Sequence, residues 1–334
     1  MKPLRIGVIG TGYWGPNIIR NVAEMRDTVL HAVCDRIPDR LNTVKRRYPA
    51  AQLFTDHRAM LQDPDLDAVA IATPVSTHYA IARDALLARK HIFVEKPLTD
   101  KSATARALTA LAKRKRRILM VDHVFLYSAP VRKIKELVTS GHLGDIYYFD
   151  SVRVNLGLFQ KDVNVIWDLA VHDLAIMDHV IGHKPKSVSA IAVSHIKGSG
   201  KEDLAYITVR YPGQVLAHIH VNWLAPAKIR QILIGGAKRM VVYDDTNPSE
   251  KIKVFDKGVS PVNKAHRQVD YRLGDMWAPN LDMSEALRRA LGHFVDCVRS
   301  RHRPLSDGDA GTRIVRLLES ADRSARLHGR EIIL

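Results

Sequence analysis

Short apolar runs alternate with helical patterns through the first 123 residues, and this alternation restricts the fold more than any other feature of the chain. Apolar runs joined to helices by short connections are typical of a parallel sheet that helices cover on both faces. We therefore expect an α/β domain with a doubly wound parallel sheet at residues 1–123. The strand-like runs are LRIGVIG (4–10), TVLHAVCD (28–35), AVAIAT (68–73), KHIFVEKP (90–97) and RILMVDH (117–123).

The pattern changes after residue 123. A helical segment at 131–140 precedes longer runs in which apolar and polar residues alternate, which favours an antiparallel sheet with one exposed face. A chain of 334 residues that is 46% hydrophobic also exceeds what one core usually organises. We expect a second α/β domain at 124–334 with a large, mainly antiparallel sheet. Its expected strands are 146–155, 205–211, 214–224, 229–236 and 239–245, its turns Pro212-Gly213 and Gly235-Gly236, and its later helices 282–300 and 311–328.

The charge balance is strongly basic, with 51 Lys and Arg against 35 Asp and Glu, a net charge of +16. The densest run, residues 113–117, ends a predicted helix, where cations suit the negative end of the helix dipole. Because no aromatic or helix-turn-helix pattern accompanies it, we expect no nucleic-acid partner. The charge agrees instead with an anionic small substrate.

Cysteine content and hydropathy indicate the compartment. Cys34 and Cys297 are the only cysteines, which suits reduced thiols in the cytosol. No run of eighteen apolar residues occurs, and the N-terminus begins a strand instead of a signal sequence. We expect a soluble cytoplasmic protein with no membrane partner.

The first strand-like run leads into Gly10-Thr11-Gly12-Tyr13-Trp14-Gly15, a G-x-G-x-x-G sequence between a predicted strand and a predicted helix. The first glycine suits a tight turn, the second lets the backbone approach a pyrophosphate, and the third lets helix and strand pack closely. Asp35, at the end of the second run, suits the hydroxyl groups of an adenosine ribose. The arrangement predicts a dinucleotide site that includes Tyr13 and Trp14; an ordinary turn with glycines is the alternative.

The residues after the second and third runs refine this site. Asp35 favours NAD, because its charge repels a 2′-phosphate, but Arg36 leaves NADP open, because arginine can pair with that phosphate. An exposed loop cation is the alternative for Arg36. Thr73, Pro74 and His78 belong to a loop at the carboxyl edge of the sheet, where ligands bind. They are predicted cofactor contacts, and simple capping of a helix is the alternative.

Lys96 follows a buried strand at the same edge, between Glu95 and Pro97. Proline removes a backbone donor and stiffens the turn. A lysine in this place is usually a solvated surface charge, so a catalytic role depends on the rest of the chain.

Residues 166–182 form a predicted helix in which Asp168 and His172 stand four apart and share one face. The flanking positions are apolar, so this polar stripe interrupts a largely buried helix. A satisfied core histidine with a capping aspartate is one alternative. A metal site is another, but no further ligand set supports it, so we expect no metal.

Taken together, these motifs resemble the glucose-fructose oxidoreductase and inositol dehydrogenase family (Gfo/Idh/MocA) over essentially the whole chain. The resemblance implies a Rossmann domain, an α/β domain whose open sheet often serves oligomerisation, and an active site to which both contribute. It also implies a cis peptide bond before Pro97. The matching features are Gly10, Gly12 and Gly15, the A-T-P-x-x-x-H sequence at 72–78, Glu95-Lys96-Pro97, and Asp168 with His172.

By this resemblance Lys96 and His172 are catalytic, Asp168 assists them and Glu95 shapes the cofactor site. Such groups suit hydride transfer between a sugar carbinol carbon and a nicotinamide. Neutral His172 is the expected base for the hydroxyl proton, and a cationic Lys96 would stabilise the alkoxide. A neutral Lys96 acting as base, with His172 orienting it, stays open.

Further substrate contacts are expected just ahead of the 166–182 helix. Arg153 and Asn155 alternate onto one face of a strand, and Lys161, Asn164 and Trp167 lead into the helix. They join Lys96, Asp168 and His172 as predicted substrate-binding residues, with ordinary strand and loop surface as the alternative. Tyr127 either enters the cleft or packs in the core.

Residues 12–17 and 151–173 look most similar to family members associated with nucleotide-sugar metabolism. We therefore expect an NAD(P)-dependent oxidoreductase acting on a nucleotide-linked sugar, such as C3 of a UDP-linked aminosugar uronate. A free inositol or sugar dehydrogenase is one alternative, and a non-catalytic NAD-binding sensor is another. We also expect a homodimer or homotetramer formed through the C-terminal sheet, where His218, His220 and Asn222 line either the interface or a wet surface.

Overall fold

The computed structural model of the chain describes residues 2–157, 159, 162–196, 198, 200–259 and 271–334. Its contacts group into two compact units, and neither is continuous in sequence. The first unit comprises residues 1–127 and 284–316, and the second comprises 128–283 and 317–334. The segment 284–316 therefore groups with the N-terminal unit, whereas the sequence analysis expected 124–334 to form one domain.

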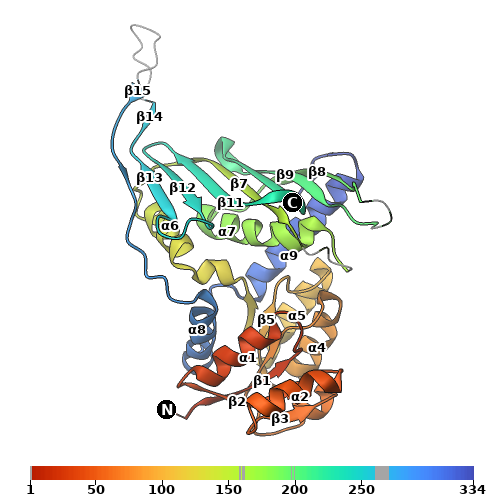
Figure 1. Cartoon of the computed structure of the whole chain (residues 1–334). Helices are drawn as coiled ribbons and strands as arrows, with labels where there is room; N and C mark the ends of the chain where they lie inside the picture. The colour runs from red at the N-terminus through yellow and green to blue at the C-terminus, as the bar shows by residue number, and fades with distance from the viewer. Residues whose placement is uncertain (1, 158, 160–161, 197, 199, 260–270) are drawn as a thin grey trace. The chain divides into compact units, whose positions relative to one another are not determined.

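A parallel sheet forms the centre of the first unit, with the strand order β3-β2-β1-β4-β5-β6 (Figure 1). The doubly wound sheet expected from the sequence is confirmed, although β3 was missed because so short a strand carries little pattern. The strands are β1 (Leu4–Ile9), β2 (Thr28–Cys34), β3 (Gln52–Phe54), β4 (Ala68–Ile71), β5 (His91–Glu95) and β6 (Leu119–Asp122).

Helices cover this sheet. Helix α4 packs against α5, and α1 packs against α8, so the C-terminal segment contributes to the cover of the N-terminal sheet (Figure 1). The helices are α1 (Gly15–Glu24), α2 (Pro38–Arg47), α3 (His57–Leu61), α4 (Val75–Leu87), α5 (Ser102–Lys115) and α8 (Ala286–Ser300), with a 3₁₀ turn η1 (Val124–Tyr127). Helix α9 (Gly308–Arg326) begins in the first unit and ends in the second.

Strand burial explains why these sequences form a covered sheet. Every residue of β4 is completely buried, as a continuous apolar run predicts for a strand with helices on both faces. The chain winds from β1 to β2 on one side and from β4 to β5 on the other, so β1 and β4 are the switch point of the sheet. Ligands of such folds bind outside the carboxyl ends of the strands at this point.

The second unit contains a mixed sheet with the order β16-β13-β12-β11-β7-β10-β9-β8-β17. Strands β7 and β10 run parallel, and the other pairs that the structure describes in this sheet run antiparallel, so the expected mainly antiparallel sheet is confirmed. The strands are β7 (Ile146–Leu156), β8 (Ser187–Val193), β9 (Leu204–Arg210), β10 (Leu216–Asn222), β11 (Leu224–Gly236), β12 (Met240–Asp244), β13 (Ile252–Phe255), β16 (Met276–Trp277) and β17 (Ile332–Ile333).

Shorter elements complete this unit. Helices α6 (Ala129–Thr139) and α7 (Val171–Ile181) pack on each other, and α7 also packs on β7. A π-helical turn, η2 (Ile166–Ala170), precedes α7, and a 3₁₀ turn, η3 (Pro212–Gln214), joins β9 to β10. Strands β14 (Gly258–Val259) and β15 (Tyr271–Arg272) pair separately.

The turn expected at Gly235-Gly236 lies instead within β11, where these glycines pair with Tyr148 and Ile146. A side chain at Gly235 would collide with the Tyr148 ring, and one at Gly236 would collide with the Leu143 carbonyl. The glycines are therefore required by close approach of neighbouring groups, and the reversal follows at residues 237–239. The turn at Pro212-Gly213 is confirmed.

One face of the mixed sheet is more exposed than the other. In β9, Ala205, Ile207 and Val209 are completely buried, whereas Tyr206 between them is 42% exposed. On the neighbouring strand His220 stacks on Tyr206 with ring centroids 4.4 Å apart. Within the residues that the structure describes, no helix combines the length and apolarity that crossing a membrane requires.

Candidate functional site

The glycine loop after β1 has the form that a dinucleotide requires. Gly10 adopts φ +96°, and a Cβ there would collide with the backbone of Ala72, while a Cβ at Gly15 would collide with the Gly10 carbonyl. At Gly12, by contrast, no atom of the described residues other than its own chain neighbours lies within 4 Å of a Cβ position. The first and third glycines thus make the turn and the packing, and the second leaves space for a ligand's phosphates.

Asp35 lies directly beside this loop and is 7% exposed. Its Oδ2 accepts hydrogen bonds from the Thr11 amide at 2.8 Å and the Thr11 hydroxyl at 2.7 Å, and its Oδ1 accepts from the Ile37 amide at 2.9 Å. Burial would raise the pKa of Asp35, but these hydrogen bonds outweigh burial and lower the pKa. The carboxylate is therefore charged and fixed in place, as a ribose-binding acid needs to be.

Two arginines stand near Asp35. Arg36 is exposed, and Arg40, at the start of α2, places Nη1 3.6 Å from Asp35 Oδ2. Arg36 was predicted from the sequence but Arg40 was not, because the first turn of α2 carries no recognisable motif. In dinucleotide-binding folds of this kind, an arginine near the ribose-binding acid can accommodate a 2′-phosphate.

The loop after β4 is tied to the turn after β5 by His78. This side chain is 1% exposed, with Nδ1 2.9 Å from the Pro97 carbonyl oxygen and Nε2 2.9 Å from the Thr73 carbonyl oxygen. The Thr77 hydroxyl donates to the Thr73 hydroxyl at 2.8 Å. His78 therefore holds two loops at the carboxyl edge together, which is a supporting position and not an exposed one.

Lys96 occupies the turn after β5. The Lys96–Pro97 peptide bond is cis, as the resemblance implies, and the Lys96 amide donates to Glu95 Oε2 at 3.2 Å. Lys96 itself is half-buried. The glycine loop, Asp35 and Lys96 thus all follow carboxyl ends of strands in one parallel sheet.

Two acidic groups and a histidine lie beside Lys96, and of these Glu95 is half-buried. Glu95 and Asp122 are register partners at the ends of β5 and β6, and His123 follows directly. Asp122 is 1% exposed and His123 is 3% exposed. Burial, and to a lesser degree Lys96, lowers the pKa of His123 to about 3, so the imidazole is neutral. The sequence analysis assigned a role only to Glu95 in this cluster.

In the second unit, Asp168 and His172 lie at the junction of η2 and α7, and both are half-buried. The expected continuous α-helix at 166–182 is therefore replaced at its start by a π-helical turn, a feature found frequently at functional sites. Asp168 Oδ2 accepts a hydrogen bond from the indole Nε1 of Trp223 at 3.1 Å. Trp223 belongs to no recognisable motif, so its contact with Asp168 was not predicted from the sequence.

Arg153 does not lie where a substrate contact was expected. Its guanidinium is 3% exposed and forms two hydrogen bonds to Asp173, at 2.7 and 3.1 Å, while Ser151 donates to the same carboxylate at 2.8 Å. Burial opposes the charge of Arg153, but Asp173 outweighs it and raises the pKa. The alternation of β7 turns this arginine toward α7 and the interior, so Arg153 is not among the substrate contacts that we propose.

The other expected contacts are spread along the approach to α7. Asn164 is 7% exposed; its Nδ2 donates to Glu202 and Asp322, and its Oδ1 accepts from the Trp167 amide at 3.2 Å. Asn164 thus supports the π turn. Asn155 and Trp167 are half-buried, and Lys161 lies outside the described residues. Tyr127 packs in the core, with its hydroxyl 2.9 Å from that of Ser306.

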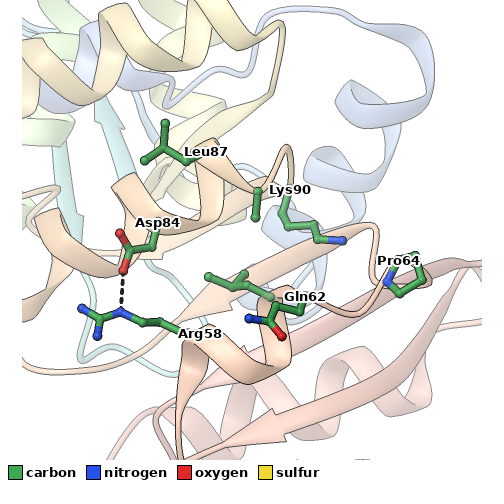
Figure 2. Close-up of a pocket in the computed structure, with 8 residues that line it drawn as sticks. Arg58, Gln62, Pro64, Asp84, Leu87 and Lys90 are labelled. Atoms are coloured by element: carbon green, nitrogen blue, oxygen red, sulfur yellow. Dashed lines mark hydrogen bonds and ion pairs between the residues drawn. The ribbon is translucent and has the colours of Figure 1, made fainter.

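An open hollow of about 560 Å³ lies elsewhere in the first unit (Figure 2). Its charged lining is already engaged: Lys90 donates to the carbonyl oxygens of Asp63 and Leu66, at 2.6 and 2.8 Å, and Arg58 pairs with Asp84 at 3.3 Å. Lys90 precedes β5, so the hollow lies at the amino edge of the sheet. It is therefore separate from the glycine loop and Lys96, which follow the carboxyl ends.

Comparison with known proteins agrees with this architecture. The chain is 26% identical over 319 residues to UDP-N-acetylglucosamine 3-dehydrogenase of Acidithiobacillus ferrooxidans, covering 94% of this chain and 95% of that protein. It is 25% identical over 272 residues to myo-inositol 2-dehydrogenase of Thermotoga maritima, covering 76% and 79%. The solved structure of the Acidithiobacillus enzyme superposes with a TM-score of 0.84 at 24% identity, covering 98% and 99%.

Family models match both parts of the chain. The model of the oxidoreductase family with an NAD-binding Rossmann fold matches residues 4–123, and the model of the GFO/IDH/MocA C-terminal domain matches residues 131–242. The glycine loop and Asp35 fit the cofactor that the first model names. The chain therefore belongs to the Gfo/Idh/MocA family of NAD-binding oxidoreductases.

Proposed function

We propose that the protein transfers a hydride between NAD and a hydroxyl-bearing carbon of a nucleotide-linked sugar, such as C3 of a UDP-linked aminosugar uronate. The observation that carries this choice is the similarity to a UDP-N-acetylglucosamine 3-dehydrogenase over nearly the full length of both chains. The net charge of +16 suits a substrate that carries phosphates and a carboxylate.

Three side chains carry the proposed proton chemistry. His172, neutral, takes the proton of the substrate hydroxyl as hydride leaves the carbon, and Asp168 orients it. The Lys96 ammonium stabilises the negative charge that develops on that oxygen, a contribution of about 3 kcal/mol for one preorganised donor. NAD, held by the backbone around Gly12 and by Asp35, would supply the hydride acceptor. The alternative in which Lys96 is the base and His172 orients it stays open.

The cofactor contacts that we propose lie in the first unit. The backbone around Gly12 receives the pyrophosphate, and Asp35 receives the ribose hydroxyls. Tyr13, Trp14, Thr73 and Pro74 complete this set by their place at the same carboxyl edge, and Glu95 helps to shape the site. Because Asp35 is charged, NAD should bind more tightly than NADP, while Arg36 and Arg40 keep binding of NADP measurable.

The experiment is a turnover assay with NAD or NADP and a panel of UDP-linked sugars, UDP-linked uronates, free sugars and inositols, followed by the absorbance of the reduced nicotinamide. Turnover of a UDP-linked sugar at a higher kcat/KM than any free polyol supports the proposal. Preference for inositol would favour the alternative activity, to which the Thermotoga relative points. Cofactor binding without turnover of any compound would favour a non-catalytic sensor.

We further propose that the chain forms a homodimer or homotetramer through the exposed face of the mixed sheet. That face carries His218, His220 and Tyr206, with Ile191 60% exposed on the next strand. An apolar and aromatic face of this kind suits a second copy of the chain. Sedimentation analysis of the wild type and of Ile191→Lys tests this oligomer.

The cytoplasmic location of the protein stays a prediction.

A further inference from the structure

Glu95 and Asp122 bring two carboxyl groups together inside the first unit. They are the last residues of β5 and β6, and their Cα atoms are partners in the parallel register. Register partners on adjacent strands project to the same face of a sheet, and adjacent strands lie about 4.8 Å apart. The two carboxyls are therefore immediate neighbours.

The oxygens of these carboxyls have too few donors. Glu95 Oε2 accepts from the Lys96 amide at 3.2 Å. Glu95 Oε1 and both oxygens of Asp122 are buried, and no donor among the described residues meets hydrogen-bond geometry with them. A buried carboxylate without donors is unfavourable, and two adjacent carboxylates also repel each other. One proton relieves both problems, because a protonated carboxyl donates to its neighbour.

The electrostatic surroundings agree with a single shared proton. Burial, and then Asp122, raises the pKa of Glu95 well above its usual range. Burial raises the pKa of Asp122 to about 6, although Glu95, Trp14 and Lys96 each lower it. Above about pH 6 the proton therefore resides on Glu95 and the charge on Asp122.

The groups that face this pair come from several elements. Lys96, in the turn after β5, favours the charged form of both carboxyls. His123 follows β6 and is neutral, and Trp14 belongs to the glycine loop. Tyr127, in η1, is also neutral, because burial raises its pKa. Lys96 is thus the cation that acts on both acids, and one positive charge balances one shared negative charge.

We propose that Glu95 and Asp122 share one proton and act together as a monovalent anion that positions the Lys96 ammonium. The positioning role rests on the proposed function, whereas proton sharing does not. The two acids are positioning residues, since they act on the substrate only through Lys96. If the pair loses its negative charge, either by binding a second proton or by substitution, the Lys96 side chain should no longer be held in position.

The proton itself is tested by infrared spectroscopy of the full-length protein at pH 7.5. The carbonyl stretch of a protonated carboxylic acid should be present in the wild type and absent from Glu95→Gln. Glu136→Gln, which changes an exposed carboxylate on α6, is the matched control and should retain the band. A wild-type spectrum without that band, or a band that survives in Glu95→Gln, would overturn proton sharing.

The positioning role is tested with variants that change the charge of the carboxyl pair. Glu95→Gln and Asp122→Asn each leave one carboxylate and one amide donor, whereas the double variant has no charge. Acetylation of Lys96 by a small reagent at fixed pH, followed by mass spectrometry, should be about tenfold faster in the double variant than in either single variant, because no neighbouring anion then holds the side chain in place. Equal rates in all three variants would overturn positioning.

Kinetics separates this inference from the proposed function. The wild-type kcat should fall more steeply as pH decreases through about 6 than the kcat of the double variant, because Asp122 gains the second proton there in addition to any protonation of the base. A purely structural pair would lower kcat without altering the pH profile, and that outcome would overturn positioning. If no substrate turns over but Lys96 labelling responds as expected, the proposed reaction fails and the carboxyl pair stands.

Discussion

The indole Nε1 of Trp223 donates a hydrogen bond to Oδ2 of Asp168 at 3.1 Å, and Trp223 is 1% exposed. This buried donor fixes the carboxylate at the π turn just before His172. Asp168 is thereby held in one orientation by a residue that lies 55 positions further along the chain. The proposed role of Asp168, to orient the base, depends on this kind of support.

Trp223→Phe is therefore expected to lower kcat about tenfold while changing KM little, because the ring still fills its site but the carboxylate loses its donor. The free energy of unfolding should fall by about 1 to 3 kcal/mol, the cost of an unmade buried hydrogen bond. Steady-state kinetics and urea unfolding measure the two effects. Trp277→Phe, in the partly exposed strand β16, is the control, and an equal loss of kcat there would argue against the role of Trp223.

Arg153 should act on stability and not on substrate affinity. Arg153→Met leaves the buried carboxylate of Asp173 without its cationic partner, so the free energy of unfolding should fall by about 3 to 5 kcal/mol. Arg210→Met, which removes an exposed partner 3.6 Å from Glu331, should cost less than about 1 kcal/mol. Urea unfolding compares the two variants, and KM of the folded fraction should be unchanged. A raised KM with normal stability in Arg153→Met would restore Arg153 as a substrate contact.

His91 should make the protein sensitive to acid. Its Nδ1 accepts the Ile118 amide at 3.0 Å, and burial, followed by Arg117, lowers the pKa of His91 to about 4 from 6.5. Because the unfolded chain binds a proton below pH 6.5 and the folded chain does so only near pH 4, stability present at higher pH is lost as the pH falls through this window.

The decrease in the free energy of unfolding that His91 alone causes amounts to at most about 3 kcal/mol between pH 6.5 and 4. Unfolding free energies of His91→Gln measured across that range should therefore depend less on pH than those of the wild type. His302→Gln, at an exposed position, is the control. An unchanged pH dependence in His91→Gln would show that His91 titrates normally in the folded state.

The sequence predicts the Rossmann unit well, because β4 is a continuous apolar run and β1 and β5 are mostly apolar, so their burial follows directly from composition. The glycine loop and Asp35 could be predicted for the same reason, since turn geometry and ribose recognition are local requirements. Lys96 and the cis bond at Pro97 followed only from the resemblance, as a lysine at a strand end has no unique meaning.

Other features depend on contacts between distant segments. The π turn at Ile166–Ala170 keeps helical periodicity in the sequence, so a pattern of apolar residues does not distinguish it from an α-helix. Arg153 was expected to face a ligand, but its partner Asp173 lies on another element, and only the fold reveals that pairing. Asp122 escaped notice because a single acid after an apolar run usually lies in water, whereas the register places it against Glu95.

The most direct test of the proposed dehydrogenase compares Lys96→Met, His172→Ala and the double variant in single-turnover assays with NAD and a UDP-linked sugar. If the two residues serve one proton transfer, the rate of each single variant should fall at least about a hundredfold. The rate of the double variant should then be little lower than that of the slower single variant. Cofactor affinity, measured by fluorescence titration, should remain in His172→Ala. Undiminished turnover in the double variant would contradict the account.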